Sequence, residues 1–157
     1  MILKPIKVVV DTNVFIKAFF HNDKSCQKIL QYNNENKIKF CFNEYTNNEL
    51  YYILGELLQK LMQEKNVSKM LSRFGKMMYN IEKVEHNTRT NYSIDKSDNN
   101  FIDCCIDGQA KYLITSDIHL ENVRDKLKEI KQKYELDLKI LSPLQFSMEM
   151  LRLKFKE

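Results

Sequence analysis

The chain has 157 residues, of which 43% are hydrophobic and 29% are charged. This length and composition predict one globular domain spanning residues 1–157. No apolar run approaches the roughly 20 residues that a membrane span needs, so we do not expect this chain to be a membrane protein. The segment from Met1 to Pro5 leads directly into Val8, without the apolar core and cleavage site of a secretory signal. We therefore expect the protein in the cytoplasm.

The use of cysteine and glycine excludes several classes of protein. The 4 cysteines include the adjacent pair Cys104 and Cys105 but no CxxC motif, so we expect reduced, partly buried thiols and no zinc site. With only 3 glycines and 2 prolines, the chain fits neither a loop-rich sandwich nor a nucleotide-binding glycine loop. The formal net charge of +4 alone only hints at an anionic partner.

Along the chain, short β-branched or aromatic runs alternate with longer amphipathic stretches. The predicted strands are, in order, 7–10, 38–42, 81–84, 111–115 and 138–141. The predicted helices are 13–20, 24–33, 45–64, 67–79, 98–107, 122–134 and a last one after Pro143. Ser142 as N-cap before Pro143 is a helix start signal, and Gly108 is expected just past the end of the 98–107 helix. This alternation predicts an α/β fold with a mainly parallel five-stranded sheet covered on both faces.

Acidic residues follow two of the predicted strands and begin or enter two of the helices. Asp11 comes directly after Val10, and Asp117 comes after the fourth strand with one residue between. Parallel strands would bring both carboxylates to one edge of the sheet, where ligands of open α/β sheets bind. Asp98 lies at the start of the 98–107 helix, and Glu49 lies one turn into the 45–64 helix.

Each of these acids alone has an ordinary structural explanation, because aspartate at a strand end or helix start is commonly a cap or turn former. Several carboxylates at one strand edge, however, would repel one another without a cation. Mg²⁺ prefers carboxylate oxygens and retains waters, and a divalent cation activates water in phosphodiester hydrolysis. The set of acids therefore favours a metal site.

The motifs around these acids resemble a known family. The run Val8-Val9-Val10-Asp11-Thr12-Asn13, then Glu49, then Asp98-x-x-Phe101-Ile102, then Thr115-Ser116-Asp117-x-x-Leu120 is similar to the acidic quartet of PIN-domain ribonucleases, across residues 6–145. Among these, the chain most resembles the VapC-type toxins of bacterial toxin–antitoxin pairs. The resemblance implies a three-layer α/β/α sandwich with a central parallel sheet, Mg²⁺ or Mn²⁺ at the acids, and single-stranded RNA as the substrate.

Carried over to this sequence, the resemblance makes Asp11, Glu49, Asp98 and Asp117 the catalytic, metal-binding acids, directly or through water. Asn13 and Thr115 are then supporting groups that orient carboxylates and water, although Asn13 is equally well placed as a helix N-cap. The implied reaction is attack of a metal-activated water on phosphorus, which leaves a 5′-phosphate and a 3′-hydroxyl.

Other polar residues near the motifs have to be weighed against the quartet. Asp103 is turned well away from Asp98 on a helix, so we interpret it as solvated. His119 is interpreted as an exposed bystander. Glu44, Asp95 and Glu56 remain alternative candidates for ligands.

The basic residues suit an RNA substrate, because the chain apart from the four acids is more strongly positive than the whole. The candidate phosphate contacts are Lys17, Lys24, Lys69 and Arg73. For most single lysines, a solvated helix face is the ordinary alternative.

The stretch from Leu57 to Met78 is more apolar and methionine-rich than a solvated helix hairpin needs. Together with the family resemblance it predicts a homodimer, and a cognate antitoxin covering Asp11 and Asp117 with a basic or apolar segment.

Three functions compete at this point. A metal-dependent endoribonuclease of toxin type is favoured. A haloacid-dehalogenase-like phosphatase normally has a second Asp two residues after the first, where this chain has Asn13. A catalytically silent PIN-like module that only binds RNA or protein is the third, and the presence of all four acids argues against it.

Overall fold

The protein, analysed as a computed structural model, is built on one parallel sheet whose middle strand leads into the candidate site. The structure describes residues 3–61 and 64–156. The strands are β1 (Ile6–Val10), β2 (Ile38–Phe42), β3 (Ile81–Lys83), β4 (Tyr112–Ile114) and β5 (Lys139–Leu141). They form a five-stranded sheet in the order β3-β2-β1-β4-β5, and every neighbouring pair is parallel. The predicted parallel five-stranded sheet is confirmed.

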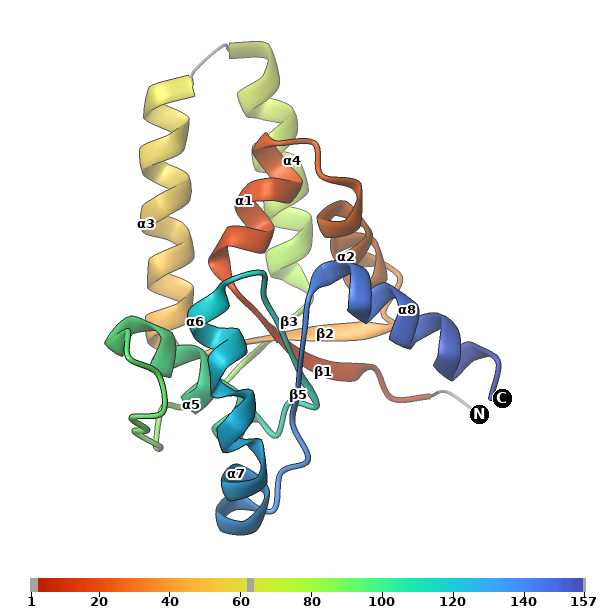
Figure 1. Ribbon diagram of the computed structural model, residues 1–157. Helices are drawn as coiled ribbons and strands as arrows, with labels where there is room; N and C mark the ends of the chain where they lie inside the picture. Colours follow the sequence, from red (N-terminus) through yellow and green to blue (C-terminus); the bar gives the residue numbers. More distant parts are fainter. Residues whose placement is uncertain (1–2, 62–63, 157) are drawn as a thin grey trace.

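Helices cover both faces of this sheet (Figure 1). The α-helices are α1 (Thr12–Phe20), α2 (Lys24–Asn34), α3 (Glu44–Leu61), α4 (Glu64–Tyr79), α5 (Asn99–Gly108), α6 (Ile118–Glu121), α7 (Leu127–Tyr134) and α8 (Pro143–Lys154). Two short 3₁₀ turns, η1 (Lys96–Asp98) and η2 (Asn122–Lys126), precede α5 and α7. The last residues of the predicted 45–64 helix include 62–63, which lie outside the described residues, and the predicted 122–134 helix divides into η2 and α7.

Two separate apolar cores explain the three layers. Side chains of β1 alternate between the faces, so Val8 and Val10 join the core under α1, α2, α3, α4 and α8, while Val9 joins the core under α5, α6 and α7. Both cores are completely enclosed at β1, whose valines are at most 3% exposed. The α/β/α sandwich implied by the sequence is therefore the observed architecture, with β1 at its centre.

Helix boundaries follow local capping chemistry. Ser142 accepts from the backbone of Gln145, and the Gln145 side chain accepts from the Ser142 N–H, so the predicted start signal of α8 forms a full capping box.

The four cysteines are free and buried, as expected. Burial raises the pKa of the Cys26 and Cys41 thiols to about 12, which keeps them protonated and unreactive.

The prediction for Gly108 is wrong in its detail. The left-handed residue at the end of α5 is Gln109, with φ of 54°, and Gly108 is the last helical residue. Glycine is required at 108 for a different reason: a Cβ there would lie 2.9 Å from Cγ2 of Val84 and 3.6 Å from Cβ of Cys41. Close packing of α5 on the sheet therefore selects glycine.

The prediction for Asp103 is also wrong. It points away from Asp98 along α5, but the segment that follows β3 covers that face, and Asp103 is only 3% exposed. Its carboxylate accepts from the Thr90 N–H at 2.8 Å and the Thr90 hydroxyl at 2.7 Å, and lies 2.9 Å from Nε2 of His86. One turn later, Asp107 accepts from the N–H groups of Asn87 and Thr88. These two aspartates fasten the segment between β3 and η1 to α5.

The packing at Gly108 predicts a difference between two glycine substitutions. Gly108→Ala should lower the free energy of unfolding by about 1 kcal/mol, because overpacking against Val84 outweighs the gain in helix propensity. Gly55→Ala on α3 is the matched control, because a Cβ at Gly55 meets nothing within 4 Å and should stabilise by about 0.5–1 kcal/mol. Urea denaturation of both variants measures the difference, and equal stability would show that Val84 gives way without cost.

Candidate metal and nucleic-acid site

The sheet brings two of the predicted acids side by side. β1 and β4 are neighbours, with Val10 paired to Ile114, and the Asp11 N–H donates to the Ile114 carbonyl at 2.9 Å. Asp11 and Thr115 thus follow adjacent strand ends, and Asp117 comes two residues later. This is the point where the strand order reverses direction around β1, as expected for a ligand site in such a sheet.

Thr115 is the residue that links these acids. Its hydroxyl donates to Oδ2 of Asp11 at 2.9 Å and accepts from the Asp117 N–H at the same distance, and its side chain is fully buried. Because one hydroxyl uses its donor and its acceptor in different directions, it fixes Asp11 and the Asp117 backbone relative to each other. The position fits the supporting role expected for Thr115.

Glu49 is carried by a different element and lies in the second turn of α3. The Thr12 hydroxyl donates to Oε2 of Glu49 at 2.5 Å, so the first residue of α1 holds the carboxylate. Glu49 is near enough to Asp11 to raise the pKa of that carboxyl. Sequence reasoning missed Thr12; the only available signal was its place directly after Asp11, on the strand-to-helix turn.

Asp98 has a carboxylate that its own helix does not use. It stands at the N-cap of α5 without a side-chain capping bond, and it is 6% exposed. Within the described part of the chain, its carboxylate accepts one hydrogen bond, from the Ser93 hydroxyl at 3.5 Å. Ser93, which no sequence signal marked, lies in the segment that Asp103 and Asp107 fasten to α5.

The capping explanation of the other acids is partly correct. Asp11 is the N-cap of α1 and accepts from the Asn13 N–H at 3.4 Å, and Oδ1 of Asp117 accepts from the His119 N–H at 2.8 Å. Asn13 itself is one residue inside α1, so the suggestion that it caps this helix is wrong. Its side chain is exposed beside Asp11.

Burial and mutual repulsion perturb two of the carboxyls. Burial is the main cause that raises the pKa of Asp11 to about 6, with the charges of Asp117 and Glu49 adding to it. Burial likewise raises the pKa of Asp98 to about 7, followed by the charges of Asp117, Asp95 and Asp11. The four acids therefore share one electrostatic environment, and Asp95 lies at its edge.

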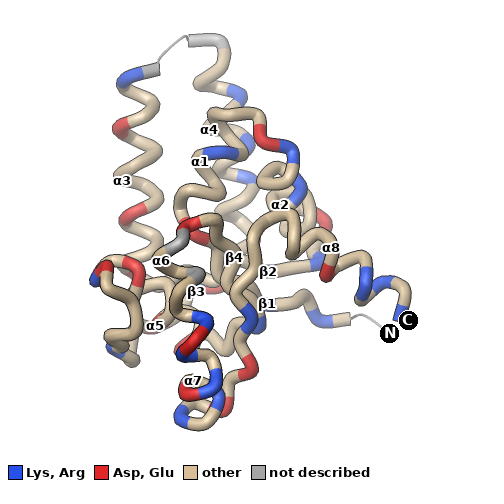
Figure 2. Tube along the Cα trace, viewed as in Figure 1, with Lys and Arg blue, Asp and Glu red and all other residues tan. Residues whose placement is uncertain are grey.

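Among the described residues, no basic side chain forms an ion pair with these acids, although the charge of His119 lowers the pKa of Asp98. The ion pairs formed within residues 3–61 and 64–156 involve neither Asp11, Glu49, Asp98 nor Asp117. Figure 2 shows acidic residues around the point where α1 leaves β1, and basic residues farther along α1, α2 and α4. Lys17 is one of the candidate cations, and its Nζ donates to the Ser116 hydroxyl at 3.1 Å instead of to a carboxylate.

The acids fit a hard divalent cation, although they do not form a closed cage. Among the described residues, no three His, Cys, Asp or Glu side chains are grouped tightly enough to hold a metal ion by themselves. Mg²⁺ is usually held by one or two carboxylates and keeps several waters, so an open set of oxygen donors suits it. The absence of a balancing Lys or Arg within the described ion pairs leaves charge for such a cation to neutralise.

The three alternative acids either accept a hydrogen bond within their own segment or are exposed. Asp95 caps η1 by accepting from the Ser97 N–H at 3.0 Å. Glu56, farther along α3, accepts from the Tyr52 hydroxyl at 2.9 Å on an exposed surface. Glu44 is exposed in the first turn of α3.

The raised pKa values predict an unusual dependence of stability on pH. The folded protein holds protons on Asp11 and Asp98 that the unfolded chain, with a pKa of 3.8, has already released. These protons stabilise the fold below about pH 4, and the stabilisation is lost as pH rises through 6 and 7. Without metal, the melting temperature should therefore fall as the pH rises from the unfolded-state pKa to the folded-state pKa values.

Asp98→Asn should remove part of this loss and raise the stability of the metal-free protein at pH 8 by on the order of 2 kcal/mol. The matched control is Asp125→Asn, at an exposed position on η2. Thermal melts in EDTA at pH 5 and pH 8 measure both variants. If Asp98→Asn is destabilised at pH 8, Asp98 is held by favourable contacts and does not suffer repulsion.

Comparisons with known proteins show the family to which the chain belongs. The family model described as PIN domain matches residues 7–119, which include Asp11, Glu49, Asp98 and Asp117. The uncharacterized protein MJ1680 of Methanocaldococcus jannaschii is 33% identical over 152 residues, which cover 92% of this chain and 91% of that protein. A crystal structure of VapBC2 from Rickettsia felis, bound to a DNA fragment from their promoter, is similar in fold. It has a TM-score of 0.51 and 16% identity, and the match covers 86% of this chain and 98% of that one. The strand-edge acids and the matched sequence together show that the chain belongs to the PIN domain family of nucleases, whose members generally use divalent metal ions.

Proposed function

We propose that the protein is a metal-dependent endoribonuclease that cleaves single-stranded RNA and acts as the toxin of a toxin–antitoxin pair. The observation that carries this proposal is the uncompensated pair Asp11 and Asp98, two buried carboxyls with raised pKa beside Asp117 and Glu49. Such an arrangement costs stability in the absence of a cation, so a binding role explains why the sequence tolerates it.

In this proposal Asp11, Glu49, Asp98 and Asp117 hold Mg²⁺ or Mn²⁺, directly or through water. The bound cation supplies water activation and neutralises the charge that develops on phosphorus. Thr115 orients Asp11, and Thr12 orients Glu49. Lys17 and Ser116 stand at the rim, where they can contact a phosphate next to the cleaved bond. Asn13, exposed on the first turn of α1, can donate to a ligand water or a ribose hydroxyl.

The domain limits and the partner are also proposed. Residues 1–157 would form one nuclease domain on the single sheet. The fold is similar to that of VapBC2, and this supports a cognate antitoxin as partner. An Arg or Lys from that partner could satisfy Asp11 and Asp117 in place of metal, because no basic side chain in the described ion pairs does so.

Two other functions are less well supported. The match to the PIN domain family disfavours a haloacid-dehalogenase-like phosphatase, and Asn13 stands where such an enzyme needs a second Asp. A silent binding module would have no need for buried carboxyls that form no ion pair within the described part of the chain. Among the described residues no helix is long and apolar enough to cross a membrane.

Cleavage chemistry gives the direct test of the nuclease proposal. With Mg²⁺ or Mn²⁺, single-stranded RNA should be cut to products with a 5′-phosphate and a 3′-hydroxyl, because water is the nucleophile. EDTA should stop the reaction, and Asp98→Asn should lower the rate at least a hundredfold while Asp125→Asn leaves it unchanged. End-group analysis that finds 2′,3′-cyclic phosphate would contradict the proposal, because the ribose hydroxyl would then be the nucleophile.

The proposed homodimer has a candidate surface on α3 and α4. Part of the Leu57–Met78 stretch is ordinary core: Met77 is 1% exposed, and Phe74 and Met78 pack against the core. Leu71 and Tyr51, however, are each 50% exposed at an apolar hollow of about 170 Å³ between α1, α3 and α4. Met62 of this stretch lies outside the described residues.

Light scattering at micromolar concentration should show a dimer. Leu71→Glu should give a monomer without lowering the melting temperature, because Leu71 is already half exposed, and the neighbouring exposed Ser72→Glu should remain dimeric. A wild-type monomer under these conditions would remove the dimer from the proposal.

A further inference from the structure

Basic side chains gather on a surface beyond the far end of α1, away from the acids. A hollow of about 410 Å³ between α2 and α4 is lined by Lys24, Lys28 and Arg73, with Gln27, Gln31 and Leu30 between them. A second hollow of about 340 Å³ shares Arg73 and is lined also by Lys69, Phe19 and Phe20. We call the two together the α2–α4 groove.

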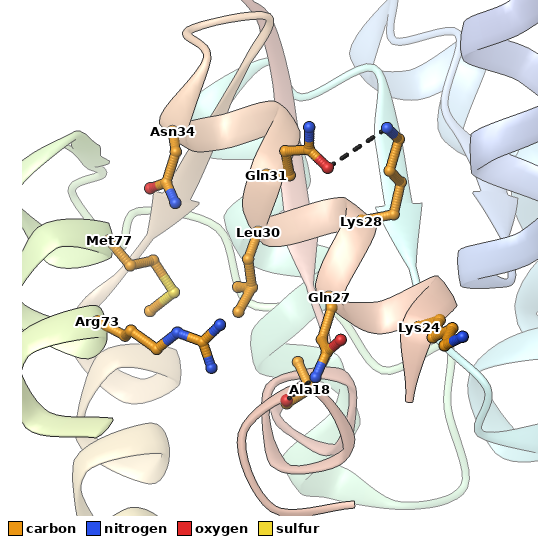
Figure 3. A pocket seen from close by; sticks show the side chains of 9 residues that line it. All are labelled: Ala18, Lys24, Gln27, Lys28, Leu30, Gln31, Asn34, Arg73 and Met77. Carbon is orange, nitrogen blue, oxygen red and sulfur yellow. Dashed lines mark hydrogen bonds between the residues drawn. The ribbon is translucent and has the colours of Figure 1, made fainter. Parts of the chain in front are cut away.

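The groove has a one-sided charge. Its described lining residues include four cations and no Asp or Glu. Figure 3 shows the guanidinium of Arg73 pointing from α4 toward α2. Arg73 takes part in none of the ion pairs formed by the described residues, so its charge is available to an incoming anion.

The acids nearest the groove are already engaged. Asp23 caps α2 by accepting from the Cys26 N–H at 3.0 Å. Glu35 accepts from Gln31 at 2.6 Å and pairs with Lys37 at 2.7 Å. Asp23 keeps its negative charge and Glu35 is balanced by Lys37, so the four lining cations still leave the local field of the groove positive, although Glu35 and Tyr32 attract Lys28 from outside it.

The groove is connected to the candidate active site by Lys17. Its ammonium bonds to Ser116 beside Asp117, and its charge also lowers the pKa of Asp23 at the start of α2. Lys24 is the residue directly after Asp23 and begins α2. α1 has 9 residues and is therefore about 14 Å long, so a strand of a few nucleotides could run from the acids to the groove.

We infer that the α2–α4 groove holds backbone phosphates of single-stranded RNA whose cleaved bond lies at Asp11 and Asp117. Lys24, Lys28, Lys69 and Arg73 contact the phosphates, and Phe19 and Phe20 offer aromatic faces for bases in the second hollow. The assignment of the cleaved end rests on the proposed function, whereas the binding of RNA in the groove does not.

The salt dependence of RNA binding tests the groove without requiring cleavage. Binding of a labelled 12-nucleotide single strand is measured by fluorescence anisotropy in EDTA over a range of salt concentrations. Each phosphate contact contributes about 0.7 to the slope of log K against log salt for single strands. Lys24→Gln with Arg73→Gln should therefore reduce the slope by about 1.4, so that a fourfold rise in salt weakens wild-type binding about sevenfold more than variant binding.

Two control proteins separate this result from a general effect of charge or folding. Lys126→Gln with Lys128→Gln removes two exposed charges from η2 and α7 on the other face of the sheet and should keep the wild-type slope. Lys24→Arg with Arg73→Lys keeps both charges and should also keep it. A groove variant with an unchanged slope overturns the inference.

An acidic partner protein is the competing occupant of the groove. If a ten-residue glutamate peptide binds the wild type but not the groove variant, and RNA binding is the same in both, the groove receives protein and the inference is wrong. If the slope falls as stated but no RNA is cleaved with Mg²⁺ or Mn²⁺, the RNA groove stands and the proposed nuclease function fails.

Discussion

Burial of several carboxyls close together at the end of β1 is the constraint to which the surrounding structure responds. Asp11 and Asp98 are buried beside Asp117 and Glu49, and both carry raised pKa values. Three of the four acids accept a hydrogen bond from a hydroxyl: Asp11 from Thr115, Glu49 from Thr12, and Asp98 from Ser93. These donors are neutral hydroxyls, so they fix the carboxylates in place without cancelling their charge. The negative charge of the carboxylates therefore remains available to the cation that we propose.

The fold supports this crowding because β1, the strand that leads to Asp11, is deeply buried. β1 is enclosed by both apolar cores, and its pairing with β4 sets the separation of Asp11 from Thr115. The segment that presents Ser93 lacks strand or helix between Val84 and Asp95, yet it is fastened to α5 by Asp103 and Asp107. A loop that carries part of a site is thus given some of the rigidity of the helix beneath it.

Much of the fold could be predicted from the sequence, because short buried strands separated by amphipathic helices indicate a parallel sheet. The acids after Val10 and Thr115 were expected at one edge of that sheet, and the bond from the Asp11 N–H to Ile114 places the two strand ends side by side. The catalytic and metal-binding roles of the acids stay predictions. The features that the sequence did not predict depend on contacts between segments distant in the chain. Helical periodicity describes only α5 itself, so it predicts a solvated Asp103, whereas the segment that covers this residue comes from residues 84–95. Gly108 has the sequence position of a helix terminator, and Val84, the side chain that a Cβ at this position would meet, is 24 residues away. Thr12 and Ser93 could be recognised as supporting residues only once their acids had positions in space.

The order of the acids along the chain has a consequence for synthesis. Asp11 emerges early, but its neighbour on the sheet, β4, is made about a hundred residues later. The middle strand of the sheet therefore waits for its second partner until most of the protein has been translated, and closure of such distant pairs is the slow, late step of folding. Asp117 arrives with that same strand. A ribosome-bound or prematurely terminated chain that lacks β4 therefore has no assembled cluster of acids at the end of β1.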